Sequence, residues 1–314
     1  MILAGMALLV KGADWIIDGA SELAKKFNVS PLVIGMTVVA FGTSFPEFVV
    51  NIFSALNGST DLALGNIVGS NIANILLILG VIAFLRPPKV SQSTIWKEIP
   101  MSLLAAVILF MAANDLLIDG VMPSSITRID GLVMLAFFAI FIYYSYGMAK
   151  RGKLEGITPK RCCFSTQKIS LLIFGGLTAI YFGGVWTVEN AVLIAQNLGI
   201  SEFLISATII AIGTSLPELV TGVIAAMKKH TDIGIGTVVG SNIFNIFFVL
   251  ASTAVISPIA LPAFANFDLI WLIFINILLF TFVFLERHRT LERTEAITFI
   301  FLYLVYIFIV IGRG

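Results

Sequence analysis

The chain has 314 residues, of which 59% are apolar and only 12% are charged. This composition excludes an ordinary soluble domain, because about a quarter of the residues in such domains are charged. The formal net charge of +1 argues against a nucleic-acid partner, which requires a strongly basic surface. We therefore expect an all-α integral membrane protein whose solvent is the lipid bilayer.

Ten stretches of the sequence are long and apolar enough to cross a bilayer as helices, since one span needs about 20 mainly apolar residues. No cleaved signal peptide is expected, because Met1 leads directly into apolar sequence without a preceding basic segment. The predicted transmembrane helices lie near residues 2–22, 31–56, 61–85, 96–114, 130–149, 169–195, 202–227, 232–257, 266–286 and 294–312.

The basic residues are unevenly distributed among the predicted loops. Most of the 19 lysines and arginines fall in alternate loops, and the segment 150–168 is the most basic of these. Short basic loops stay on the cytoplasmic side, so we predict a cytoplasmic 150–168 loop and two extracytoplasmic termini in the plasma (inner) membrane. The adjacent Cys162 and Cys163 of this loop are expected to be reduced thiols.

The sequence contains an internal repeat. Sliding the chain on itself by 171 residues aligns 37–80 with 208–251 without a gap, and nearly half of the aligned positions are identical. Five helices are an odd number, so a second five-helix half must cross the membrane in the inverted orientation. We predict two inverted five-helix repeats, 1–150 and 169–314, joined by a basic linker at 151–168. Inverted repeats around a central site are typical of secondary transporters.

Each half has an acidic motif near the centre of a predicted span. The segment GTSFPE at 42–47 matches GTSLPE at 213–218. A charged side chain at mid-membrane costs about 3 kcal/mol or more unless a cation or a water-filled cavity compensates it. The proline of each motif removes a helical N–H, which frees backbone carbonyl oxygens that then need another partner. Glu47 and Glu218 are therefore predicted to bind a cation together.

A second pair of motifs follows one span later in each half. The segment GSNIAN at 69–74 matches GSNIFN at 240–245. A serine and an asparagine one helical turn apart can present neutral oxygens to one cavity, while the leading glycine allows close helix packing. For Asn71 and Asn242, simple hydrogen bonding between helices is an equally good interpretation.

All donors in these motifs are hard oxygens, and the four segments contain no His, Cys or Met. Such a set suits Ca²⁺ or Na⁺ and does not suit zinc or copper. One Ca²⁺, two Na⁺ or two protons would each neutralise two ionised glutamates, so these residues alone leave Na⁺ and H⁺ open as the exchanged ion. No resident cofactor is expected. The predicted ligands are Thr43, Ser44, Glu47, Ser70, Asn74, Thr214, Ser215, Glu218, Ser241 and Asn245.

The four motifs resemble those of the cation/calcium exchanger superfamily, specifically the sodium/calcium exchanger branch with its small prokaryotic members. The resemblance covers essentially the whole chain. It implies electrogenic antiport of Na⁺ and Ca²⁺ by alternating access, with a calcium site between Glu47 and Glu218. It also implies flanking sodium sites that include Ala40 and Ala211, and a gate formed by the first and sixth helices. Proton/calcium exchangers usually carry a different acidic motif, so proton coupling is the less expected alternative.

Some relatives have an aspartate where this chain has Asn245, and that aspartate is associated with potassium transport, so a potassium-coupled mechanism is not favoured. An ion channel is a second class to consider, but inverted halves favour a transporter. An intramembrane hydrolase needs unequal acidic partners, whereas the two glutamates have nearly identical neighbours, so we expect no enzyme. We expect a functional monomer. Lys11 and Asp14 in the first helix form a neutralising pair or line the ion path, and both alternatives stay open.

Overall fold

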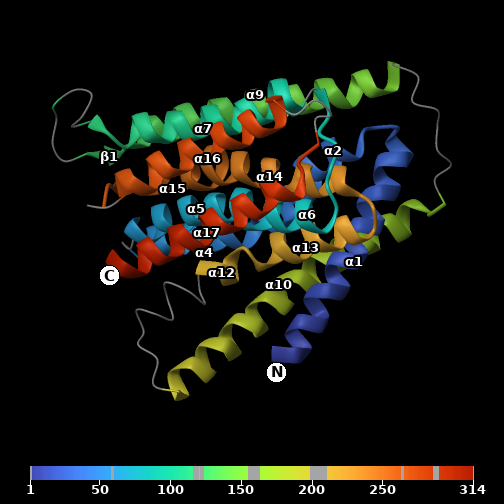
Figure 1. The fold of residues 1–314 in the computed structure, drawn as a ribbon, viewed down its shortest axis with the longest axis horizontal. Coiled ribbons are helices and arrows are strands. Elements are labelled where there is room, and N and C mark those ends of the chain that lie inside the picture. Colours follow the sequence, from blue (N-terminus) through green and yellow to red (C-terminus); the bar gives the residue numbers. More distant parts are fainter. Residues whose placement is uncertain are drawn as a thin grey trace.

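The structure is a computed structural model that describes residues 2–57, 60–92, 94–115, 120, 124–154, 163–198, 211–262, 265–285 and 290–313, without the side chains of 60–62, 151–154, 211–212 and 285. Long helices lie roughly side by side in most of this part of the chain (Figure 1). The helices α1 (Ile2–Phe27) and α10 (Thr166–Asn197) form a pair at one edge that is inclined to the others.

The remaining helices form several continuous segments, because short helices and π-helical turns follow one another directly. The helices are α2 (Pro31–Ile34), α3 (Ala40–Thr43), α4 (Phe45–Leu56), α5 (Thr60–Ala73), α6 (Gly80–Leu85), α7 (Ile99–Ala112), α9 (Arg128–Leu154), α12 (Ala211–Thr214), α13 (Leu216–Met227), α14 (Thr231–Phe244), α15 (Ala251–Ile256), α16 (Ala265–Leu285) and α17 (Arg293–Arg313). The π-helical segments are η1 (Gly35–Val39), η2 (Asn74–Leu79), η3 (Thr94–Glu98) and η5 (Asn245–Leu250).

Seven helical segments in the described residues are long and apolar enough to cross a membrane, and the bent pair Pro31–Thr43 and Phe45–Leu56 would make an eighth. The expected span at 2–22 is a helix of 26 residues, but its several charged side chains keep it outside this count. The expected span at 202–227 is described only from residue 211 onwards. The total of ten spans therefore stays a prediction.

Two central segments carry most of the packing core. The most apolar 18-residue stretch is 94% buried in Thr231–Ile256 and 78% buried in Ala63–Leu85. In the other five spans the corresponding stretch is 39% buried or less. Both segments contain a π-helical stretch that starts at an asparagine of the predicted motifs, Asn74 or Asn245. π-Helical turns inside α-helices frequently occur at functional sites. The backbone at these two asparagines is therefore of a kind that is common at binding sites.

The described residues are almost entirely helical, as predicted, apart from one short pair of strands. Two short strands, β1 (Ser125–Ile126) and β2 (Ile259–Ala260), pair antiparallel at one end of the molecule (Figure 1). Both follow stretches between predicted spans, where the chain is free to hydrogen-bond outside a helix. The helix ends also differ from the expected boundaries, since α9 continues past residue 150 to Leu154 and α10 starts at Thr166.

The inclined pair of helices is packed closely through glycines. A Cβ atom added at Gly12 would lie 2.8 Å from the backbone oxygen of Gly176, and one added at Gly183 would lie 2.7 Å from the backbone nitrogen of Leu9. Small residues let two membrane helices approach to such distances. Most of the buried apolar residues of α1 belong to a core cluster that is separate from the larger cluster around the two central segments.

Candidate cation-binding site

The helix breaks at the same position in both acidic motifs. In the first motif α3 ends at Thr43, Ser44 has φ −82° and ψ 1°, and α4 starts at Phe45 with a bend of 43°. In the second motif Ser215 has φ −89° and ψ 2° between α12 and α13. The missing proline N–H accounts for both breaks, and the matching backbone angles make the two motifs structural copies of each other.

The two glutamates are completely buried, each at 0% exposure. The carboxylate of Glu218 accepts a hydrogen bond from Ser44 Oγ to Oε1 at 3.2 Å, so a serine of the first motif contacts the glutamate of the second. Thr43 and Ser241 also lie close enough to Glu218 to interact with it. The charge of Glu218 in turn repels that of Glu47. The two acidic side chains therefore belong to one cluster in the protein interior.

A ring of hydroxyl and amide groups connects the two halves around these glutamates. Ser215 Oγ donates to Ser70 Oγ at 3.2 Å, and the Ser70 hydroxyl lies near the Glu47 carboxylate. Asn245 Nδ2 donates to Ser70 Oγ at 3.3 Å and to Asn71 Oδ1 at 3.0 Å. These contacts join residues from helices of both motif pairs, which are far apart in the sequence.

Asn71 and Asn242 connect the two central segments by hydrogen bonds, each from one side chain to the backbone of the other residue. Asn71 Nδ2 donates to the backbone oxygen of Asn242 at 3.1 Å, and Asn242 Nδ2 donates to the backbone oxygen of Asn71 at 3.4 Å. Asn74 Nδ2 donates to Asn242 Oδ1 at 2.9 Å. The hydrogen bonds between helices support the structural interpretation for this middle asparagine of each motif.

Several buried oxygens of this cluster have no hydrogen-bond partner of good geometry within the described residues. Most buried polar atoms in proteins have such a partner, so a concentration of exceptions needs an explanation. Hard cations such as Ca²⁺ and Na⁺ bind oxygens of these kinds. The unpartnered oxygens are Glu47 Oε1, Glu47 Oε2, Asn51 Oδ1, Asn74 Oδ1, Glu218 Oε2, Thr221 Oγ1, Ser241 Oγ and Asn245 Oδ1.

The remaining predicted ligands, Ala40, Thr214 and Ala211, are in three different environments. The backbone oxygen of Ala40 accepts a hydrogen bond from Ser44 N at 2.9 Å and another from Thr43 Oγ1 at 3.3 Å. Thr214 is partly buried and donates from Oγ1 to Asn66 Oδ1 at 3.2 Å. The side chain of Ala211 lies outside the described residues, although its backbone belongs to α12.

Carboxylates alone would not form a complete site. In the described part of the chain, no group of three or more His, Cys, Asp or Glu side chains could hold a metal ion. A cation bound at the two glutamates would therefore need the neutral oxygens around them. The arrangement suits an ion with many oxygen ligands and flexible geometry, as Ca²⁺ has.

The first glycine of GSNIAN and GSNIFN was predicted to allow close helix packing, and Gly240 does so. A Cβ atom at Gly240 would lie 2.6 Å from the backbone oxygen of Met36, so α14 and η1 depend on the absence of a side chain there. For Gly69 no atom of the described residues lies within 4 Å of such a Cβ, and the segment that matches Met36 in the repeat lies outside them. Its role in close packing stays a prediction.

Sequence reasoning missed two polar residues next to the glutamates. Asn51 and Thr221 lie one turn after Glu47 and Glu218 on the same helices, and both are 0% exposed. The helical spacing of four and three residues was the available signal, because residues so spaced share a helix face.

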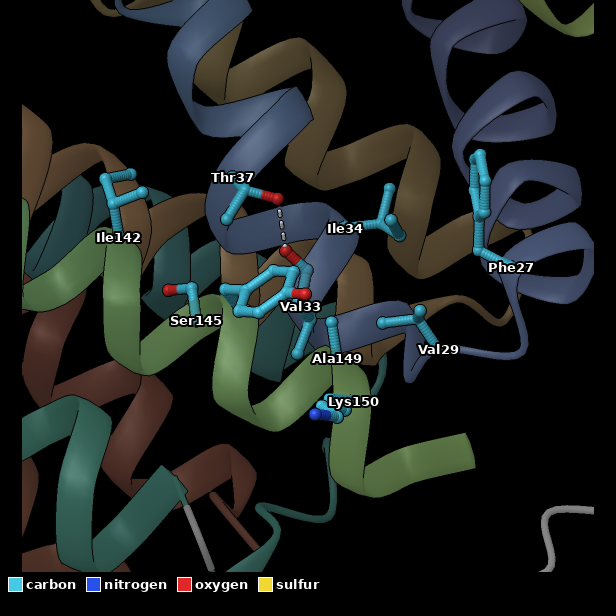
Figure 2. A pocket seen from close by; sticks show the side chains of 10 residues that line it. Phe27, Val29, Val33, Ile34, Thr37, Ile142, Ser145, Ala149 and Lys150 are labelled. Carbon is cyan, nitrogen blue, oxygen red and sulfur yellow. Dashed lines mark hydrogen bonds between the residues drawn. The ribbon is translucent and has the colours of Figure 1, made fainter. Parts of the chain in front are cut away.

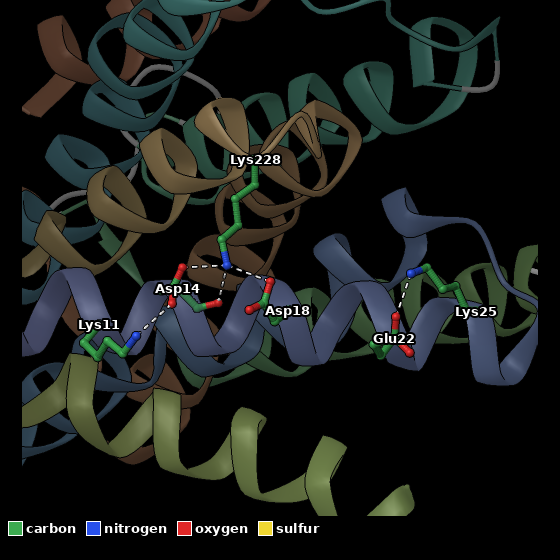
Figure 3. A network of polar contacts seen from close by, with 6 residues as sticks. All are labelled: Lys11, Asp14, Asp18, Glu22, Lys25 and Lys228. Carbon is green, nitrogen blue, oxygen red and sulfur yellow. Dashed lines mark hydrogen bonds and ion pairs between the residues drawn. The ribbon is translucent and has the colours of Figure 1, made fainter. Parts of the chain in front are cut away.

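A charged network joins α1 to the end of α13, as Figure 3 shows. Lys228 Nζ lies 2.6 Å from Asp14 Oδ1 and 2.6 Å from Asp18 Oδ1, and it donates to the backbone oxygen of Asp14 at 3.1 Å. The predicted pair of Lys11 with Asp14 is present at 3.2 Å. The lysine from the second half, which sequence spacing within α1 did not indicate, makes the shorter contacts.

A separate cavity of about 650 Å³ lies between the start of the second predicted span and α9 (Figure 2). Its wall is mainly apolar, with Thr37 and Ser145 among the few polar residues, and Thr37 Oγ1 donates to its own helix at the backbone oxygen of Val33. None of the predicted cation ligands lines this cavity. It is therefore distinct from the glutamate cluster.

The fold and the glutamate cluster together define a class: helical membrane proteins with a buried, oxygen-rich cluster built from two copies of the same motifs. Within that class, residues 1–147 and 168–312 match the family described as "Sodium/calcium exchanger protein". The chain belongs to the sodium/calcium exchanger family, as its motifs predicted.

Several relatives are similar over most of their length. The chain is 30% identical to the sodium/calcium exchanger MaX1 of Methanosarcina acetivorans, over 98% of this chain and 96% of that protein. It is 37% identical to the inner membrane protein YrbG of Escherichia coli, over 82% of this chain and 79% of the relative. A structure of the sodium-calcium exchanger NCX_Mj soaked with Na⁺ and Ca²⁺ superposes with a TM-score of 0.83 at 31% identity, over 97% of this chain and 95% of that one. Two of these three proteins, MaX1 and NCX_Mj, are named as sodium/calcium exchangers.

Proposed function

We propose that this protein exchanges Na⁺ for Ca²⁺ across the membrane by alternating access, as an electrogenic antiporter. The observation that supports this most directly is the pair of fully buried glutamates with unpartnered oxygens, at equivalent positions of two repeated motifs. One Ca²⁺ or two Na⁺ would balance both charges, so the ions compete for the same oxygens. The family relationship supports cation/Ca²⁺ antiport, and the names of MaX1 and NCX_Mj support sodium as the coupling ion.

The architecture that we propose is ten transmembrane helices in two inverted halves, 1–150 and 169–314, with 151–168 as a cytoplasmic linker. In this scheme α1 and the segment that ends with α13 are the two spans beyond the eight that length and hydropathy identify. Both termini are extracytoplasmic, the membrane is the plasma (inner) membrane, and the monomer is the functional unit. The predicted ligands, including Ala40 and Ala211, form the calcium site and its flanking sodium sites.

Transport is tested with the full chain in liposomes. Radioactive Ca²⁺ uptake is measured with outward gradients of Na⁺, K⁺ or H⁺ imposed one at a time. We expect uptake with the Na⁺ gradient alone. Because exchange in this family usually carries more sodium charge out than calcium charge in, uptake should rise when a potassium ionophore makes the lumen positive relative to a clamped zero potential. Uptake driven equally by a proton gradient without sodium would replace Na⁺ with H⁺ as the coupling ion. Flux without any counter-ion would indicate a channel.

The orientation is tested with the two native cysteines, which are adjacent and are the only ones in the chain. Cys163 is exposed in the structure. A thiol reagent that cannot cross membranes should label the protein in inside-out vesicles and leave it unlabelled in right-side-out vesicles or intact cells. Labelling from outside would reverse the proposed topology without affecting the antiport proposal.

A further inference from the structure

Asn51 presents a fixed, unpaired oxygen next to the first glutamate. Its Nδ2 donates to the backbone oxygen of Glu47 at 2.7 Å, and its Oδ1 has no hydrogen-bond partner among the described residues. Rotating the amide by half a turn would bring Oδ1 against that carbonyl oxygen, so the hydrogen bond determines which atom faces away. The side chain is 0% exposed, and a bare acceptor is unfavourable in such an interior.

Thr221 presents a similar oxygen next to the second glutamate. Other buried helical threonines of this protein donate to a carbonyl of their own helix, as Thr237 and Thr253 do to the residue four positions back at 2.8 Å. Thr221 is equally buried but makes no such bond, and its Oγ1 has no partner in the described part of the chain. Its hydroxyl is therefore directed away from its own helix backbone.

The two oxygens extend the glutamate cluster in opposite directions. Asn51 follows Glu47 towards the end of α4, and the next helix, α5, contacts β2. Helix α13, in which Thr221 follows Glu218, runs in the opposite direction to α4 (Figure 1). The repeat does not explain their presence, because the offset of 171 pairs Asn51 with Gly222 and Thr221 with Val50. A Cβ atom at Gly222 would lie 2.8 Å from Ile82 Cδ1, so an apolar side chain fills the space where the second half has no amide.

We propose that Asn51 Oδ1 and Thr221 Oγ1 are additional cation ligands, one on each side of the central glutamate pair. This inference rests on the proposed function, since it requires a cation to pass both glutamates. A neutral amide or hydroxyl oxygen is a normal ligand of dehydrated Ca²⁺ or Na⁺. The ion path then has an amide on the side of β2 and a hydroxyl on the other, so its two sides are chemically unequal.

The experiment compares three variants at position 51 and one control variant in the purified full chain. The readouts are the Ca²⁺ dependence of thermal unfolding in detergent and the half-saturating Ca²⁺ concentration for uptake into liposomes. Asn51→Leu removes the oxygen and the amide donor, Asn51→Ala does so without added bulk, and Asn51→Asp keeps an oxygen but loses the donor. The control is Asn276→Leu, because Asn276 is also 0% exposed and donates to its own helix at 2.8 Å, but its oxygen is already paired with Ser102.

If the oxygen binds the cation, Asn51→Leu and Asn51→Ala should raise the half-saturating Ca²⁺ concentration about tenfold, as for the loss of a bond to a charged group. Asn51→Asp should retain wild-type affinity or exceed it, and Asn276→Leu should not change it. A merely structural role of the amide donor predicts the opposite pattern, in which Asn51→Asp is as defective as Asn51→Ala. That pattern, or an effect of Asn276→Leu equal to that of Asn51→Leu, would overturn the assignment.

Position 221 is tested in the same way with Thr221→Val and Thr221→Ser, and with Thr253→Val as the matched control. We expect a smaller rise in half-saturating Ca²⁺ for Thr221→Val, about threefold, and none for the other two variants. A silent Thr221→Val removes this hydroxyl from the ion path. If the wild-type protein itself shows no Ca²⁺-dependent stabilisation and no counter-ion flux, the proposed function has failed; normal wild-type transport with silent variants refutes this inference alone.

Discussion

The substitution Glu47→Gln should change ion-free stability and calcium affinity in opposite directions. Glu47 is fully buried, and the charge of Glu218 repels its charge. Neither of its carboxylate oxygens has a hydrogen-bond partner of good geometry among the described residues. Glutamine has nearly the same shape but no charge, so the repulsion disappears in the variant while most packing contacts stay. The ion-free protein should therefore become more stable, and the bound cation should lose a charged ligand.

The magnitude of each effect follows from the number of unpaired oxygens. Each buried polar atom without a partner costs about 1–3 kcal/mol. Glu47 has two such oxygens, whereas Glu218 has one, because Ser44 donates to its Oε1 at 3.2 Å. Since the amide of glutamine still has unpaired atoms, we expect Glu47→Gln to stabilise the ion-free protein by about 1–2 kcal/mol, and by more than Glu218→Gln.

Calcium affinity should fall by much more than stability rises. Removing one partner from a buried pair of opposite charges costs about 3–5 kcal/mol. At 1.4 kcal/mol for each factor of ten, either variant should bind Ca²⁺ at least about a hundredfold more weakly. Both variants should also lose Na⁺-driven Ca²⁺ uptake, because one Ca²⁺ no longer balances the charge of the site.

The assay is thermal unfolding of the purified full chain, first with a chelator and then with added Ca²⁺. The matched control is Glu98→Gln, because Glu98 is also 0% exposed but lies in η3 and accepts a hydrogen bond from Tyr144. The control should keep the wild-type Ca²⁺-dependent shift. A lower ion-free midpoint for Glu47→Gln, or a normal Ca²⁺ shift in that variant, would refute the reasoning.

Three further changes test the packing and the charged network. Gly240→Ala should lower the free energy of unfolding by about 1–3 kcal/mol, because its Cβ would lie 2.6 Å from the backbone oxygen of Met36, whereas Gly147→Ala, with no described atom within 4 Å, should be neutral or stabilising in thermal unfolding. Lys228→Met should lower the unfolding free energy by about 1 kcal/mol at low salt and by less at high salt, since its aspartate partners are partly exposed. Burial, and then the charge of a nearby lysine, lowers the pKa of His230 below its ordinary value of 6.5, so stability should fall as the pH drops through 6.5 towards the lowered value. His230→Gln should remove this acid-dependent loss from the thermal midpoint, and an unchanged pH profile would contradict the assignment.

The sequence by itself determined the features that depend on local chemistry. The helix breaks before Pro46 and Pro217 follow from the missing proline N–H, and both occur at the predicted place. The apolar stretches determine where long helices form, since hydrocarbon leaves the backbone no other partner. The internal repeat places Glu47 and Glu218 at equivalent positions, which already indicated a shared cation.

Only the tertiary structure decided how these groups meet. The contacts of Ser44 with Glu218 and of Lys228 with Asp14 join residues more than 170 positions apart, and helical periodicity says which face a side chain is on but not which helix lies opposite. The same limit explains why Asn51 was missed, because its unpaired oxygen is recognisable only when every neighbouring donor is placed. The β1–β2 pair likewise depends on two loops being brought together by the helices that precede them.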